Sequence, residues 1–267
     1  MRSNLIRIWF VVTVCIVSVI ALFTAGQPQT EAKTAAPFPL QLDHVFLWVT
    51  KGAPEAKAFE NAGLHLQDHV NQHTGQGTAS KTFIFQNVYL ELIWIEDEQV
   101  AAKNAARSGI DMVTRSRWRE TGASPFGAGL HRRSGSDNVL PFPVTPYWAE
   151  WMQPNTTIEF AQTVLKNNAE PMFFVVPDYI STGSERMQAI LKERFQNNAH
   201  QLGISRISQV RIVTTGKAVT ETSKALARGG VLKVASGKAP LLELTFDDQQ
   251  KNKRVDLRPQ VPVVLKY

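Results

Sequence analysis

The segment Leu42–Glu96 constrains the fold most, because its pattern of apolar residues and turns predicts five successive elements. An alternating strand (LDHVFLWV) opens the segment, and a short helical stripe bounded by a proline and a glycine follows it. A short strand, a Gly-rich turn and two strands joined by a tight turn complete it. The segment therefore predicts a βαβββ module, with strands at residues 42–49, 65–70, 80–86 and 88–95 and a helix at 54–63.

Strand parity directs His44 and Glu91 toward a common pocket. His44 shares a strand face with Phe46 and Trp48, whereas Asp43 points to the opposite face. Glu91 is a carboxylate in the middle of an apolar strand, and burying it unpaired is costly, so it needs a partner. We expect His44 to be that partner. An imidazole and a carboxylate in one cleft suit either a divalent metal or acid–base chemistry.

A purely structural role is the alternative for both residues. In that case the His44 ring bonds a neighbouring backbone group. Glu91 then pairs with one of three cations elsewhere in the sequence, Lys81, Arg132 or Arg211.

Three further histidines, His65, His69 and His73, are spaced four residues apart. On a helix this spacing would place them on one face. The glycines around them predict strand and turn instead, so we expect no separate metal site there.

A similar pattern returns near the C-terminus. Residues 242–244 repeat the Leu-Glu-Leu of residues 90–92, after a predicted strand at 207–214 and a helix at 219–228. Overlaying the two units places Gln209 at the position of His44. The same overlay places Glu243 at the position of Glu91.

The repeat defines the expected organisation of the folded part, residues 40–267. Module one spans 40–97, an intervening region spans 98–206, and module two spans 207–267.

The sequence resembles the glyoxalase-like branch of the vicinal oxygen chelate superfamily. The similarity is carried by LDHVFLWV, by GQGTASKTFIFQNVYLELIWIED, by the stretch at 199–204 and by FDDQQKNKRVDLRPQVPVVL near the C-terminus. It covers most of the chain after Pro39 and is strongest over residues 42–96. The resemblance implies an α+β fold in which paired βαβββ modules form a cupped, partly open mixed β-barrel. The long intervening region departs from the family pattern.

The same resemblance implies a divalent metal, one of Zn, Ni, Mn, Co or Fe, in the cup. Carried over to this chain, the ligands would be His44, Glu91, Gln209 and Glu243. Such an ion would bind an oxygenated substrate and stabilise a developing enolate or oxyanion. Glu91 or Glu243 would then act as the catalytic group that moves the proton.

Further substrate contacts are expected from the first module and from the intervening region. Thr78 and Ser80, beside the Gly-rich turn, offer hydroxyls to a substrate carboxylate. Residues 140–154 combine prolines with aromatic residues, and Trp148 is expected to line the pocket as part of a lid. The alternative is a loop that its aromatic residues hold in place. Helices at 98–107 and 184–197 and strands at 127–133 and 171–177 complete this region.

The N-terminus is not expected to belong to the folded part. Arg2 and Arg7 precede the apolar run Ile8–Phe23, as in a bacterial-type export signal. Residues 1–26 are therefore expected to form a signal peptide or an uncleaved apolar helix that anchors the chain, with a polar linker at 27–39. The expected location is the periplasm or the inner membrane. A buried N-terminal helix is the alternative.

Composition and cysteine content limit the remaining possibilities. The only cysteine is Cys15, so the folded part has neither a disulfide framework nor a thiolate metal site. The net charge of +6 arises from basic residues that are spread along the chain. Nucleic acid is therefore not an expected partner, because its binding sites need a dense basic face. At 43% hydrophobic residues, the chain can form a sizeable core.

These observations predict an exported or membrane-tethered glyoxalase-like protein, either a monomer or a homodimer. Its expected activity is that of a metal-assisted lyase or isomerase on a small oxygenated substrate. The alternative is a protein that uses the same cup to bind or sequester a small molecule without catalysis. The sequence contains no GxSxG, Walker A or HExxH pattern that would favour other chemistry.

Overall fold

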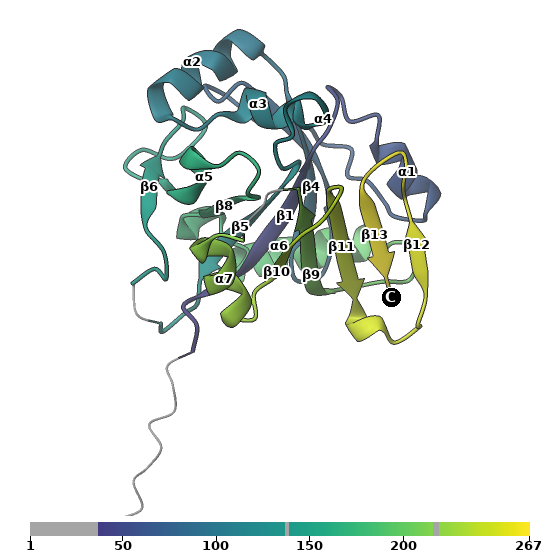
Figure 1. Cartoon of the computed structure of the whole chain (residues 1–267). Helices are drawn as coiled ribbons and strands as arrows, with labels where there is room; N and C mark the ends of the chain where they lie inside the picture. The colour runs from purple at the N-terminus through teal and green to yellow at the C-terminus, as the bar shows by residue number, and fades with distance from the viewer. Residues whose placement is uncertain (1–36, 137–138, 216–218) are drawn as a thin grey trace, which may run out of the picture. The chain divides into compact units, whose positions relative to one another are not determined.

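The predicted βαβββ module is present, although its second strand lies at 71–73 and not at 65–70. The module forms one half of an eight-stranded mixed sheet, sheet A (Figure 1). In this half the strand order is β2-β3-β4-β1, with β4 parallel to β1. The elements are β1 (Leu40–Trp48), α1 (Ala56–Asn61), β2 (Asn71–His73), β3 (Thr78–Ile84) and β4 (Tyr89–Ile95).

The computed structural model describes residues 37–136, 139–215 and 219–267. The chain divides into two units, Met1–Ala35 and Ala36–Tyr267, and the described residues all belong to the second. The predicted signal peptide or apolar anchor lies outside them. Within the described ranges, no helix is both long and apolar enough to cross a membrane.

The other half of sheet A repeats the arrangement of the first half. Counted outward from the middle of the sheet, β1-β4-β3-β2 on one side is matched by β5-β8-β7-β6 on the other. As in the first half, the last strand lies parallel to the first. The strands are β5 (Phe126–Arg132), β6 (Val144–Tyr147), β7 (Ile158–Ala161) and β8 (Met172–Val175). The partner of module one is thus formed by residues within the predicted intervening region.

Two glycines allow the halves of sheet A to join. β1 and β5 pair antiparallel at the centre, with His44 opposite Gly129 and Phe46 opposite Gly127. A Cβ atom on Gly129 would lie 2.1 Å from His44 Cε1, and one on Gly127 would lie 2.0 Å from Phe46 Cζ. The bare backbone of β5 therefore leaves the space that these two rings occupy.

Residues 207–267 form a separate five-stranded sheet, sheet B, in the order β10-β9-β11-β13-β12. This order differs from the predicted second module. In a βαβββ module the last strand lies parallel beside the first, whereas here β11 pairs antiparallel with β9 and β13 lies beyond it. The elements are β9 (Ile207–Thr214), α7 (Glu221–Arg228), β10 (Lys233–Ser236), β11 (Leu241–Phe246), β12 (Arg254–Asp256) and β13 (Val263–Lys266).

The remaining helices follow the signals in the sequence. Asp97 caps α2 by accepting a hydrogen bond from the Val100 amide, and Gly109 ends the helix with φ +74°. The Ser184 hydroxyl caps α6 in the same way. The other elements are short. The full set is α2 (Glu98–Ser108), α3 (Met112–Ser116), α4 (Trp118–Thr121), α5 (Thr163–Lys166), η1 (Asp178–Ile180), α6 (Glu185–Asn197) and η2 (Asp247–Gln249).

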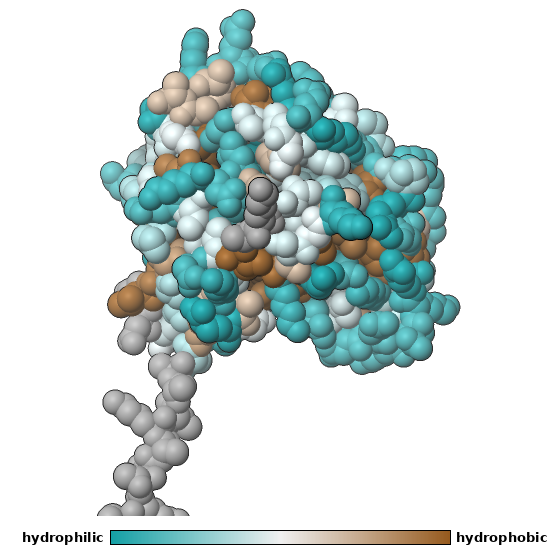
Figure 2. Space-filling model, viewed as in Figure 1, coloured by the Kyte–Doolittle hydropathy of each residue, from teal (hydrophilic) through white to brown (hydrophobic). Residues whose placement is uncertain are grey.

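One hydrophobic core continues from sheet A into sheet B. Phe85, just after β3, packs against Phe246 of β11 with ring centroids 5.0 Å apart. The Asn87 side chain donates to the Ile207 carbonyl at 2.8 Å and accepts from the Ile207 amide at 3.1 Å. Figure 2 shows that polar residues cover most of the visible face over sheet B, which leaves its other face for the core.

His200 fastens the segment after α6 to module one. Its Nδ1 atom accepts from the His65 amide at 2.9 Å, so Nε2 carries the proton and donates to the Ile84 carbonyl at 3.0 Å. Burial lowers the pKa of His200 to about 4. The folded protein therefore holds this ring neutral at pH values where the unfolded chain already protonates it.

This ring should give the protein a pH-dependent stability. The contribution of His200 to the free energy of unfolding is complete above pH 6.5. It falls as the pH drops from there to about 4, by up to about 1.4 kcal/mol per pH unit. His200→Gln keeps a donor and an acceptor but cannot titrate, so its free energy of unfolding should fall less steeply. Urea denaturation at several pH values measures both slopes, and equal slopes would contradict the assignment.

Candidate functional site

A small cavity lies between the two halves of sheet A, with a volume of about 90 Å³. We call this cavity and its lining residues the cup. Strands β1, β2 and β4 and the turn after β2 supply its polar groups. Strands β7 and β8 supply an apolar wall. The polar side is formed by His44, His73, Gln76, Tyr89 and Glu91, and the apolar wall by Ile158, Phe160, Met172 and Phe174.

Asp43 orients the His44 ring. Its Oδ1 lies 2.7 Å from His44 Nδ1, although parity predicted that the two side chains would point to opposite faces. The β-bulge between Leu42 and His44 breaks this alternation. Asp43 is fully buried, and Thr182 donates to its Oδ2 from the amide at 2.6 Å and from the hydroxyl at 2.9 Å. A carboxylate held in this way accepts a hydrogen bond from Nδ1–H, which leaves Nε2 of a neutral His44 as a base.

Glu91 lies close to two imidazoles. Its Oε2 is 3.8 Å from His44 Nε2, and its Oε1 is 3.9 Å from His73 Nε2. Both distances are too long for hydrogen bonds. The carboxylate is almost fully buried. A carboxylate this buried and this loosely held is ready to bond a ligand that enters the cup.

A chain of hydrogen bonds connects Trp151 to His73. Trp151 Nε1, which can only donate, bonds Gln76 Oε1 at 3.3 Å, so Gln76 Nε2 is the donor to Thr78 Oγ1 at 2.8 Å. Thr78 Oγ1 lies 2.9 Å from His73 Nδ1, so its hydroxyl can donate to that nitrogen. With that direction His73 carries its proton on Nε2, the nitrogen that faces Glu91. Burial lowers the pKa of His73, and this outweighs the neighbouring Glu91 carboxylate.

Aromatic rings from both halves of sheet A pack against His44. Tyr89 stacks on it with ring centroids 4.6 Å apart and planes 9° from parallel. Phe174, from the other half of sheet A, approaches it to 5.5 Å. Burial raises the pKa of Tyr89 well above its usual value, and the charges of Asp43 and Glu91 raise it further, so Tyr89 stays neutral. The rings thus limit the movement of His44.

Comparison with known proteins agrees with this architecture. The family described as "Glyoxalase-like domain" matches residues 42–228, which include sheet A apart from the first two residues of β1. The chain belongs to this glyoxalase-like family. This match confirms the resemblance that was predicted chiefly from residues 42–96. The predicted α+β fold with an open, curled mixed sheet is also confirmed.

A solved structure extends the fold comparison to most of the chain. A crystal structure of a hypothetical protein from Staphylococcus aureus superimposes with a TM-score of 0.51 at 12% identity. The match covers 85% of this chain and 98% of that one. At this identity the match shows the fold alone. No curated protein matches the sequence.

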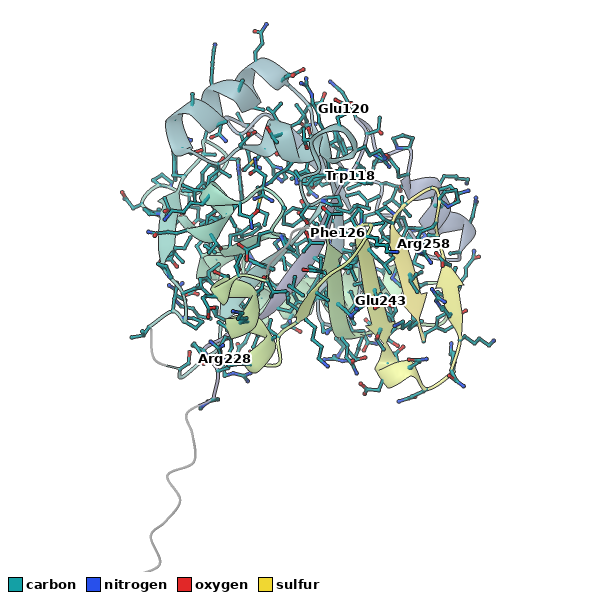
Figure 3. The ribbon with its side chains drawn as sticks, in the orientation of Figure 1. Trp118, Glu120, Phe126, Arg228, Glu243 and Arg258 are labelled. Carbon is teal, nitrogen blue, oxygen red and sulfur yellow. The ribbon has the colours of Figure 1, made fainter. Side chains whose placement is uncertain are left out.

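Of the four metal ligands inferred from the resemblance, the glyoxalase-like fold brings together His44 and Glu91. Glu243 lies on β11 of sheet B, where it pairs with Arg211 at 2.5 Å and Lys266 at 2.8 Å (Figure 3). Burial would raise the pKa of Glu243, but hydrogen bonds from these two cations lower it overall. Gln209 lies in a different, open groove of about 780 Å³. The antiparallel pairing of β9 with β11 places this pair away from the cup.

The residues present do not fit a metal held from both halves of the cup. The second half offers Gly127 and Gly129 on its first strand and Met172 and Phe174 on its last, and none of these is a ligand for a hard or borderline cation. Within the described ranges, no group of three or more His, Cys, Asp or Glu side chains is arranged to hold an ion.

The residues predicted to bind the substrate, Thr78, Ser80 and Trp148, do not line the cup. Thr78 reaches the cup only through its bonds to His73 and Gln76. Ser80 is fully buried and accepts from Asn71 Nδ2 at 3.3 Å. Trp148 is 39% exposed and does not line the cup. Trp151, three residues later in the same proline-rich loop, lines it instead.

Gly129 offers a direct check of how tightly His44 is packed. A Gly129→Ala substitution places a methyl group 2.1 Å from His44 Cε1, so it should lower the free energy of unfolding by about 1–3 kcal/mol. In a His44→Ala background the same change should cost much less, because the clashing ring is gone. Urea denaturation of the four proteins in this cycle measures the coupling. Additive effects would show that the ring does not occupy this space.

Proposed function

We propose that the protein binds a small oxygenated molecule in the cup and transfers a proton within it, as a lyase or isomerase does. The observation that carries the proposal is the Asp43–His44 pair, which presents a basic Nε2 atom to the cup, beside Glu91. A buried histidine oriented by a carboxylate is the usual arrangement of a general base. No step of the proposal passes through a metal, because the second half of the cup offers no ligand for one.

The proton transfer follows from these positions. His44 Nε2 takes a proton from a substrate carbon next to a carbonyl group, and the electron pair of the broken C–H bond moves onto the carbonyl oxygen. The buried Asp43 carboxylate stabilises the imidazolium that forms. The proton returns to a different substrate atom, either directly or through Glu91, whose Oε2 lies 3.8 Å from His44 Nε2. At the end of the cycle His44 is neutral again, and the substrate has neither gained nor lost protons or electrons.

The size of the cup limits the substrate. An engineered apolar cavity of about 150 Å³ accommodates benzene. The cup, at about 90 Å³, therefore suits a compound of no more than about four non-hydrogen atoms. The aromatic wall favours substrates with an apolar body.

Exchange of substrate hydrogen with solvent tests the proposal. The full chain, incubated in D₂O with acetone and similar small uncharged ketones and aldehydes, should speed deuterium incorporation beside the carbonyl. His44→Ala and Glu91→Gln should each lower the rate by about 10²-fold or more. His69→Ala, on an exposed ring outside the cup, should leave it unchanged. EDTA treatment should also leave the rate unchanged.

The opposite results identify the alternatives. Activity lost with EDTA and restored by one of Zn, Ni, Mn, Co or Fe would replace this proposal with a metal-dependent one. Binding without exchange in any variant would favour the second candidate, a protein that sequesters a small molecule. The observation that favours this second candidate is the uniformly apolar wall of Ile158, Phe160, Met172 and Phe174.

We also propose that residues 1–26 export the protein or tether it to a membrane. The basic start and the apolar run Ile8–Phe23 support this, since they are typical of export signals. Fractionation of bacterial cells that express the full chain should recover it in the periplasm or with the inner membrane. Deletion of residues 2–26 should leave it in the cytoplasm, and an unchanged distribution would contradict the proposal.

A further inference from the structure

His73 presents an unpaired ring nitrogen to the cup. Its Nε2 atom lies 3.9 Å from Glu91 Oε1, too far for a hydrogen bond, and no other group of the described residues bonds it. The unpaired polar side-chain atoms of the described residues that are shut off from solvent are Trp48 Nε1, Asn104 Nδ2, Arg115 Nε and Glu170 Oε2. His73 Nε2 is not one of them, so it remains accessible. Because His73 lines the cup and Nε2 faces Glu91, a ligand in the cup can reach this atom.

The bonds around Thr78 place the ring proton of His73 on Nε2. Thr78 is 1% exposed, and its oxygen accepts a hydrogen bond from Gln76 Nε2 at 2.8 Å. Within the described part of the chain, His73 Nδ1 is the one atom positioned to accept the Thr78 proton, at 2.9 Å. The reverse direction would leave a buried hydroxyl without an acceptor and would turn the Nε2 lone pair toward the Glu91 carboxylate. The tautomer with a proton on Nε2 therefore has the lower free energy.

The same chain of bonds holds the His73 ring and engages two other donors of the cup. Trp151 packs against His73 with ring centroids 5.3 Å apart and donates to Gln76 Oε1 at 3.3 Å. Gln76 in turn donates to Thr78. A donor that is fixed before a substrate arrives needs no reorganisation during the reaction.

Tyr89 also lines the cup, but its ring covers a different side of the proposed base. It stacks on His44 with planes 9° from parallel. The lone pair of His44 Nε2 lies in the plane of the imidazole, so a substrate atom that gives up its proton lies beside the ring edge and not on the face that Tyr89 covers. At this edge Glu91 is 3.8 Å away, and His73 Nε2 approaches the same carboxylate. His73 is therefore the donor on the side of the cup where the proton transfer would occur.

We infer that His73 is a further catalytic residue, whose Nε2–H donates a hydrogen bond to the carbonyl oxygen of the substrate while His44 removes the proton. The inference rests on the proposed function and adds the group that polarises the carbonyl. Negative charge develops on this oxygen as the C–H bond breaks, and the nearby Glu91 carboxylate would repel it. A fixed donor offsets that repulsion and stabilises the enolate.

His73 keeps its own proton throughout this step. A neutral imidazole can polarise a carbonyl group by hydrogen bonding alone. Burial lowers the pKa of His73, which keeps the ring neutral, so the proton that His44 removes is the only one that moves. The two imidazoles thus have opposite roles, His44 as acceptor and His73 as donor.

Deuterium exchange of acetone in D₂O tests the inference with a matched pair of variants. His73→Phe keeps a ring but removes the donor, so it should lower the exchange rate of the full chain about 10²-fold. His73→Gln keeps an N–H group near the position of Nε2 and should exchange at least about tenfold faster than His73→Phe. His69→Phe, at an exposed ring outside the cup, should leave the rate unchanged.

A spectroscopic measurement does not depend on how the variants fold. The ¹⁵N chemical shifts of an imidazole show which nitrogen carries the proton. In the unsubstituted protein the His73 signals, assigned by their absence in His73→Phe, should show a protonated Nε2 and a bare Nδ1. Acetone should move the Nε2 proton downfield. The opposite tautomer, or a proton that does not respond to acetone, would overturn the inference.

The inference and the proposed function fail in different ways. If exchange depends on His44 but His73→Phe exchanges at the unsubstituted rate, the proton transfer stands and the role of His73 is refuted. If Tyr89→Phe lowers the rate while His73→Phe does not, the Tyr89 hydroxyl is the donor instead. If acetone moves the His73 proton but no exchange occurs, the hydrogen bond from His73 stands and the catalytic proposal is refuted.

Discussion

The close approach of β5 to β1 is the contact on which the rest of sheet A depends. It joins two similar halves into one sheet, and it places the rings of His44 and Phe46 directly over a backbone that has no side chains at Gly127 and Gly129. Any larger residue there would separate the strands or displace the rings. The same contact puts the base and the apolar wall on opposite sides of one small cavity.

The first half of the fold was predictable because its signals are local. Alternation along β1 and β4, with the helix between its proline and glycine, defines the module, and the shared parity of His44 and Glu91 brings them together. The second half was not found, because β6 and β7 are short and lie among prolines and aromatic residues. The repeated Leu-Glu-Leu sequence led to the prediction of a second module at residues 207–267. Those residues form sheet B, where the same alternation arises from the antiparallel pair of β9 and β11. Alternation reports a buried face but does not identify the partner of a strand.

Two site residues were missed for related reasons. Asp43 reaches His44 only because a bulge interrupts the alternation of β1, and a bulge leaves little trace in the pattern. His73 was noted, and its assignment to strand and turn was correct, but its approach to Glu91 depends on the pairing of β2 with β3. Gly127 and Gly129 were the available signal for the centre of the sheet, since isolated glycines in a strand often mark a close approach of another group.

The hydrogen bonds from Thr182 to Asp43 have a consequence for how the site is assembled. Thr182 follows the last strand of sheet A, and Gln188 of α6 donates to its carbonyl. Every strand that lines the cup is therefore complete before the residue that fixes the orientation of the base has been added to the chain. During synthesis the pocket and its reactivity would arise at different times. A fragment that ends at β8 would lack Thr182, and with it the contact that holds the imidazole in position.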